Sequence, residues 1–240
     1  MDRHITFERL HNVRDVGGYA TADGTPVAWR RLYRADSLGK LAGEDLRRFR
    51  ELGVRTVIDL RYDFEIARDG RVPDDDVAYH HLSIEKLPYD QAGLAASVDP
   101  VATYADKNLE VAVDGAAEIR AALDVIADPG AAPVVVHCTS GKDRTGLIIA
   151  LVLGLLGVSD TDVIDDYALT ERATERLRAD QVARHPELEA LWPGYGTAPA
   201  DAMRRTIDGI IDAYGSWRGY AAKVLEIGDA EVSALRAALT

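Results

Sequence analysis

The chain has 240 residues, which is enough to bury one sizeable hydrophobic core. Apolar residues make up 47% and charged residues 28%, a balance that excludes an intrinsically disordered chain. The formal net charge of -12 disfavours nucleic acid and anionic membranes as partners. The single cysteine excludes an internal disulfide framework and any zinc site that needs several thiolates.

The first ten residues, MDRHITFERL, lack the apolar run of a secretory signal peptide. The longest apolar stretch, residues 147–156, is too short to cross a bilayer and contains Gly154. We therefore expect a cytoplasmic protein without stable membrane insertion, although export by another route stays open.

Hydrophobic spacing and turn residues predict an alternation of helices and strands. In chain order these are a helix over 41–52, strands over 54–60 and 77–82, a loop or lid over 84–100, a helix over 114–127, a strand over 133–138, a helix over 146–157, and helices over roughly 160–180, 201–214, 217–227 and 230–239, with a turn at 192–199. The alternation predicts an α/β fold, with a parallel-rich central sheet and helices on both faces. No linker divides residues 1–240, so we expect a single domain, with 160–240 as a helical extension or cover.

Residues 137–146, HCTSGKDRTG, join the strand over 133–138 to the buried helix. Cys138 precedes a helix N-terminus, where free amides and the helix dipole lower a thiol pKa, so it is the predicted nucleophile. Arg144 can offer a planar fork to two phosphate oxygens, and Thr145 can donate a hydrogen bond to the sulfur. The loop between them predicts a cradle of amides for one phosphate. Its predicted phosphate-binding residues are Thr139, Ser140, Gly141 and Lys142.

The loop sequence matches the HCx5R(S/T) signature of the protein tyrosine phosphatase superfamily, and its Lys-Asp pair resembles the bacterial atypical dual-specificity and lipid phosphatases. Residues 11–18 (HNVRDVGG), residues 32–36 (LYRAD) and residues 59–61 with Glu65 also resemble segments of that family. The C-terminal helices add no match. The resemblance implies the cysteine-phosphatase fold and a two-step hydrolysis through a phosphocysteine, without metal or cofactor. We expect His137, Asn12, Arg14 and Asp15 to support the loop rather than react.

The general acid that protonates the leaving oxygen is open among three aspartates. Asp59 ends a predicted strand at the edge where α/β sites form, but an ion pair with Arg61 explains it equally well. Asp143 lies within the loop itself, where it could instead orient a neighbouring cation. Asp36 is the third candidate.

The predicted substrates are phosphotyrosine and other phosphorylated side chains, with phosphoinositides as a second class. Lys142 is either a solvated side chain or a contact to a second phosphate. A small-molecule phosphatase acting on inositol phosphates or nucleotides, and a module that binds phosphate without cleaving it, are the alternatives. We also hypothesise that segment 84–100 or the helices of 160–215 cover the idle site. For Tyr104, Trp192 and Tyr195 we favour core packing over a role in a cleft.

Overall fold

The computed structural model describes residues 2–91, 93–184 and 192–240. Strands and helices alternate along the chain, as the α/β prediction requires. Their bounds are β1 Arg14–Asp15, β2 Leu32–Ala35, the 3-10 helix η1 Leu38–Lys40, α1 Gly43–Glu51, β3 Thr56–Asp59, α2 Asp63–Asp69, β4 Ala78–His81, α3 Pro100–Asp114, α4 Ala116–Ala127, β5 Val134–His137, α5 Asp143–Leu156, α6 Asp160–Ala168, the 3-10 helix η2 Leu169–Ala173, α7 Thr174–Arg184, α8 Ala200–Tyr214, α9 Trp217–Val224 and α10 Asp229–Leu239.

The strands form one mixed sheet in the order β1-β2-β5-β3-β4. β1 runs antiparallel to β2, and the other neighbours are parallel. The register pairs His137 at the end of β5 with Ala35 on one side and Asp59 on the other. Parallel strands therefore end together at the edge of the sheet that precedes Cys138, where ligands bind in open α/β sheets.

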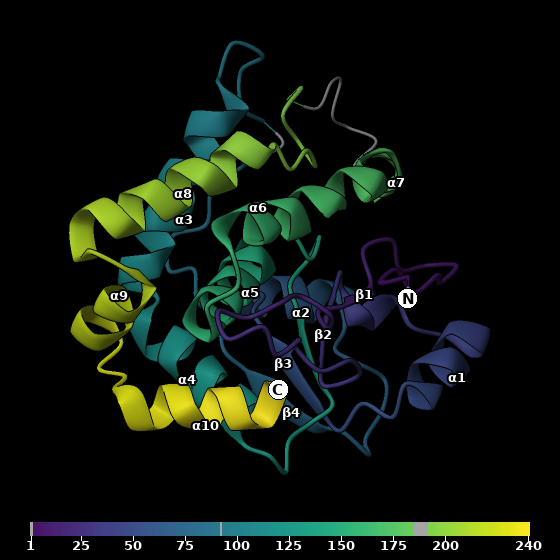
Figure 1. Ribbon diagram of the computed structural model, residues 1–240. Coiled ribbons are helices and arrows are strands. Elements are labelled where there is room, and N and C mark those ends of the chain that lie inside the picture. Colours follow the sequence, from purple (N-terminus) through teal and green to yellow (C-terminus); the bar gives the residue numbers. More distant parts are fainter. Residues whose placement is uncertain (1, 92, 185–191) are drawn as a thin grey trace.

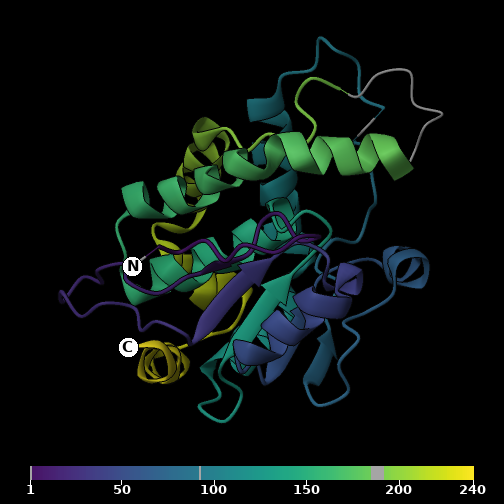
Figure 2. The ribbon, with the colours of Figure 1, turned by 90° about the vertical axis from the view of Figure 1, so that its right-hand side faces the viewer.

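Alternate residues of the central strands face two separate cores, because side chains along a strand point to opposite faces. Val134 and Val136 join the larger core, together with helices α3 to α6 and α8 to α10. Val135 joins the smaller core with Tyr33 and with Phe49 of α1. Figure 2 shows these two layers on opposite sides of the strands. The prediction of helices on both faces is confirmed.

Helix α5 lies at the centre of the larger core, and most of its side chains are buried. Gly154 lets this helix approach α9, because an added Cβ would lie 2.5 Å from the Trp217 ring. The first turn of α5 follows the phosphate loop directly. The phosphate loop is therefore continuous with a helix whose side chains are mostly buried in the larger core.

The helices after residue 158 pack on the same body as the sheet. α6, η2 and α7 run above the carboxyl ends of the strands, and α8 lies beside α3 (Figure 1). The end of α10 is joined to the N-terminal part of the chain, since the amide of Ala28 donates to the Leu239 carbonyl at 2.7 Å. In the part of the chain that the structure describes, no helix has both the length and the apolar character needed to cross a membrane.

The predicted strands and helices correspond to observed elements, but β1, β2, η1, α2 and α3 were not predicted. The start of α3 explains one omission. The predicted loop over 84–100 includes Pro100, but this proline occupies the first turn of the helix, where proline is favoured. The side chain of Asp99 caps this helix by accepting hydrogen bonds from the amides of Val101 and Ala102. The turn predicted after Trp192 is confirmed.

Candidate active site

Cys138 lies in the loop between β5 and α5, and its side chain is 3% exposed at the base of a pocket of about 210 Å³. Four further residues of the predicted phosphate loop line the same pocket. They are Thr139, Ser140, Asp143 and Arg144. Sulfur, guanidinium and a carboxyl group therefore share one cavity.

The backbone of this loop carries hydrogen-bond donors that have no partner in the part of the protein that the structure describes. Among the described residues, the N–H groups of residues 139–144 have no acceptor. Amides without a partner at the start of a helix bind anions well. The loop is therefore prepared for a tetrahedral anion.

The conformation of the loop is stabilised by side-chain hydrogen bonds from Asn12 and Arg34. The Asn12 amide donates to the carbonyl oxygens of Ser140 at 2.9 Å and Gly141 at 3.1 Å. Arg34 donates to the same Gly141 carbonyl at 2.7 Å. These bonds point the carbonyls away from the pocket. Gly141 itself has a φ of +63° and lies against the backbone of Ala35, a place that excludes other residues.

Asp166 of α6 is the anchor of this support. It is 1% exposed and forms ion pairs with Arg14, at 3.3 Å, and with Arg34. Burial raises its pKa, but the two arginines outweigh burial and lower the pKa of Asp166 to about 2. The sequence analysis assigns a supporting role to Arg14 but none to Arg34 or Asp166. An arginine within the apolar β2 was the available signal for Arg34. Asp166, one of several acidic residues on α6, carried none.

Arg144 is oriented by Glu65 of α2. Its two terminal nitrogens donate to the Glu65 carboxylate at 2.6 and 3.0 Å, and Thr139 donates to the same carboxylate. Burial opposes the charge of Arg144, but the hydrogen bonds with Glu65 and the charge of Cys138 raise its pKa. The guanidinium is thus held charged and planar beside the cysteine.

Asp143 lines the pocket and is one-quarter exposed at its side chain. Its carboxylate accepts a hydrogen bond from the Tyr167 hydroxyl at 3.3 Å and lies 3.5 Å from the Lys142 ammonium. Asp143 is therefore fixed by neighbours from the phosphate loop and from α6 while remaining open to a ligand.

Lys142 does not occupy either predicted environment. Its side chain is 1% exposed and does not line the pocket. The ammonium donates to the Thr197 carbonyl at 2.8 Å and lies 3.5 Å from the centre of the Tyr104 ring. Burial lowers its pKa, and Asp143 opposes this. Lys142 thus connects the loop to the C-terminal segment instead of contacting a second phosphate.

Asp59 and Thr145 also lie apart from the pocket. Asp59 is completely buried and accepts hydrogen bonds from Arg61 at 2.7 and 2.9 Å and from the Tyr79 hydroxyl at 2.9 Å. Burial raises the pKa of Asp59, but His137 and Arg61 lower it well below its usual range. This is the ion-pair alternative to a role as general acid. The Thr145 hydroxyl is buried with no hydrogen-bond partner among the described residues, so the predicted bond to the sulfur is not observed.

The remaining predicted residues have structural contacts. Asp15 accepts hydrogen bonds from the amides of Gly17 and Arg30 at 2.8 Å each, which fixes a turn rather than the loop. His137 lies 3.4 Å from Asp59 and contacts the Cys138 carbonyl at 3.2 Å. Asp36, the third acid candidate, is buried and accepts from the amides of residues 11 and 12.

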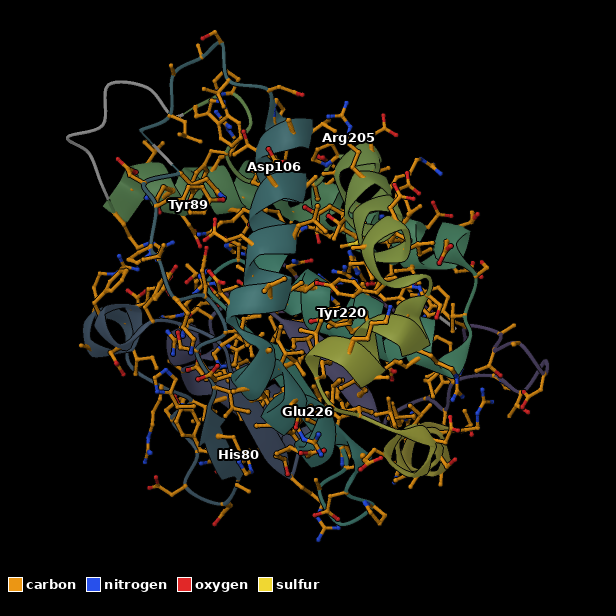
Figure 3. All side chains as sticks on the ribbon, turned by 90° about the vertical axis from the view of Figure 1, so that its left-hand side faces the viewer. His80, Tyr89, Asp106, Arg205, Tyr220 and Glu226 are labelled. Carbon is orange, nitrogen blue, oxygen red and sulfur yellow. The ribbon has the colours of Figure 1, made fainter. Side chains whose placement is uncertain are left out.

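Aromatic side chains form the upper walls of the pocket. Tyr62 and Phe64 stack with ring centres 5.1 Å apart, and Tyr89 and Tyr195 line the cavity from two other segments. Figure 3 shows Tyr89 on the segment that passes beside α3. Segment 84–100 and the C-terminal region thus both reach the pocket. Tyr104 and Trp192 are buried in one core cluster and Tyr195 packs against it, so core packing is confirmed for all three, and Tyr195 lines the cavity in addition.

Comparison with known proteins decides the family. The sequence model of the tyrosine phosphatase family matches residues 5–240. The chain belongs to this family. The match extends well beyond residues 11–146, where the motif resemblance was found, and includes the C-terminal helices of the tyrosine phosphatase.

Individual relatives agree with this assignment. The tyrosine-protein phosphatase H16_A0669 of Cupriavidus necator is 28% identical over an alignment of 260 residues. The alignment covers 96% of this chain and 87% of the relative. The triple specificity protein phosphatase PtpB of Mycobacterium tuberculosis is 30% identical over 195 residues, which cover 70% and 69%. Among solved structures, P. aeruginosa TpbA is 18% identical, with a TM-score of 0.33 and coverage of 78% and 94%.

Proposed function

We propose that this tyrosine phosphatase hydrolyses phosphotyrosine and other phosphorylated protein side chains through a phosphocysteine at Cys138. The observation that carries the proposal is the set of unpaired amides at residues 139–144, in a loop of which Thr139, Ser140 and Asp143 line the same pocket as Cys138 and Arg144. A dianionic phosphoryl group satisfies these donors and the guanidinium together. Fixed donors of this kind need no rearrangement when charge develops in the transition state.

The reaction has two steps. The Cys138 thiolate attacks phosphorus, the S–P bond forms, and the bond from phosphorus to the ester oxygen breaks while Asp143 gives that oxygen its proton. The Asp143 carboxylate then takes a proton from a water molecule that attacks the phosphocysteine. Inorganic phosphate leaves, the thiolate is restored and Asp143 is protonated again. The position of Asp143 in the pocket supports this role over Asp59.

Phosphotyrosine is favoured over polyphosphorylated substrates by the pocket walls. The aromatic rings at the mouth suit an aromatic ester. The lining also includes four carboxyl groups beside three cations, and each carboxyl group that stays ionised repels further phosphates. The carboxyl groups are Glu65, Glu85, Asp90 and Asp143, and the cations are Arg68, Lys107 and Arg144. The name of the relative PtpB, a triple specificity phosphatase, keeps phosphoinositides as a second substrate class.

The test is release of inorganic phosphate, without added metal, from phosphotyrosine and phosphoserine peptides, phosphoinositides and soluble inositol phosphates. Cys138→Ser is assayed in parallel. We expect turnover that disappears in the variant, with phosphotyrosine peptides hydrolysed fastest. Faster hydrolysis of inositol phosphates would instead support the small-molecule alternative. Binding of phosphopeptides without any release of phosphate would favour the non-hydrolysing module.

A further inference from the structure

Glu85 is a carboxylate within the pocket that the proposed reaction does not use. It follows β4, its side chain is 8% exposed, and it lines the same cavity as Cys138. The charged atoms near it are Arg144 Nε at 3.4 Å and Lys107 Nζ at 3.6 Å. Both distances are long for a charge-assisted hydrogen bond, so the carboxylate is buried without a close ionic partner.

The position of Glu85 matters because of how Arg144 is held. The terminal nitrogens of Arg144 donate to Glu65, and the Nε side faces Glu85. A guanidinium binds phosphate through two N–H groups on one edge. With Glu65 on one edge, the edge containing Nε remains for a substrate phosphate. Glu85 lies at that edge.

A phosphate dianion and the Glu85 carboxylate repel each other at this distance. Burial raises the pKa of Glu85, and Asp143 adds to this, whereas Arg144, Tyr62 and Lys107 act in the opposite direction. Lys107 is shared, since its ammonium also lies 2.7 Å from Glu110 and donates to the Leu87 carbonyl. A bound dianion favours the protonated form of Glu85 further.

We propose that Glu85 is a specificity-determining residue that competes with the substrate phosphate for Arg144, so that a phosphate dianion binds together with a proton taken up at Glu85. This inference rests on the proposed function for its biological meaning, because it concerns the same phosphate site. It predicts that Glu85 weakens anion binding increasingly as the pH rises. Glu85 therefore also limits the total negative charge that can bind beside Arg144.

The test uses sulfate, which stays a dianion between pH 5.5 and 8. Its affinity is obtained from the rise in Tm with sulfate concentration, a measurement that needs no turnover. At pH 8 we expect Glu85→Gln to bind sulfate about tenfold more tightly than the wild type, and this advantage to shrink towards pH 5.5. Glu110→Gln is the matched control, since it also releases Lys107 but lies outside the pocket lining.

Equal sulfate affinity of Glu85→Gln and wild type at pH 8 would overturn the inference, as would the same gain in Glu110→Gln. Glu85→Ala gives a second variant with the same expected sign if Glu85→Gln does not fold. In turnover assays we expect KM to fall while kcat stays level. A kcat that falls more for poor leaving groups would make Glu85 a general acid and refute the competitor role. If the wild type lacks turnover but the sulfate result holds, the proposed function fails and the competition stands.

Discussion

The Glu65 carboxylate and the Arg144 guanidinium form two parallel hydrogen bonds, of 2.6 and 3.0 Å, beside the cysteine. The pair is nearly buried, and it fixes which edge of Arg144 faces the cavity. The guanidinium is therefore preorganised by a residue that need not touch the substrate.

We predict that Glu65→Gln lowers kcat/KM by about 10- to 100-fold, because Arg144 loses its bidentate partner and its fixed orientation. The measurement is steady-state hydrolysis of a phosphotyrosine peptide. Asp63→Asn is the matched control, since Asp63 is on the same helix and its side chain is 97% exposed. Equal losses in both variants would show a general effect of charge rather than an effect of orientation.

Asp143→Asn tests the general acid. We expect kcat for a phosphotyrosine substrate to fall by about 10²- to 10⁴-fold, and far less for an ester whose leaving group is already very acidic. The reason is that a good leaving group needs no proton as it departs. Asp90→Asn, which removes another pocket carboxylate, serves as the control. Equal slowing of both esters by Asp143→Asn would remove Asp143 from this role.

Asp166 links stability to pH. Its pKa in the folded protein is about 2, below the 3.8 of an ordinary aspartate, so its contribution to stability is complete above pH 4 and is lost as the pH falls towards 2. We predict that Asp166→Asn lowers the free energy of unfolding by about 3 kcal/mol at pH 7, because Arg14 and Arg34 lose their buried counter-charge. The deficit relative to wild type should narrow below pH 4.

Urea unfolding between pH 2.5 and 7 measures this dependence. Asp165→Asn is the control, since Asp165 is exposed on the same helix. A difference between wild type and Asp166→Asn that stays constant down to pH 2.5 would mean that ionisation of Asp166 does not provide the stability.

Gly141→Ala tests the fit of the loop against the sheet. An added Cβ would lie 2.4 Å from the Ala35 carbonyl oxygen, and the nearest atoms are all backbone, which cannot move aside. We expect a loss of more than about 2 kcal/mol of stability and a large loss of phosphate affinity, both measured by thermal unfolding with and without phosphate. Gly24→Ala separates the two causes, because Gly24 also has a positive φ but its Cβ would meet no atom within 4 Å.

Local sequence signals predicted much of this protein. The β-branched runs at 54–60 and 133–138 predicted the central strands, because parallel strands are buried on both faces. The strand β2 was not predicted because Arg34 interrupts its apolar pattern. This arginine is nevertheless buried, because it forms an ion pair with Asp166. The loop around Cys138 was recognised because its residues are adjacent in the chain.

Roles that depend on contacts between distant residues could not be predicted. Lys142 is adjacent to the loop in sequence, but Thr197 and Tyr104 decide where its ammonium lies. Glu85 follows β4 and lines the pocket near Lys107 of α3, and nothing in its sequence neighbours signals this. Asp59 ends the expected strand, but Arg61 two residues later neutralises it.

The ion pairs that support the phosphate loop also join the N-terminal part of the chain to helix α6. Arg14 and Arg34 are buried near the start of the chain, and the charge that neutralises them is Asp166, beyond the phosphate loop. A protein cut after α5 would keep every residue from Cys138 to Thr145, yet it would leave two buried cations without a counter-charge. Helix α6 is thus part of the support of the phosphate loop, because it carries the counter-charge of both arginines.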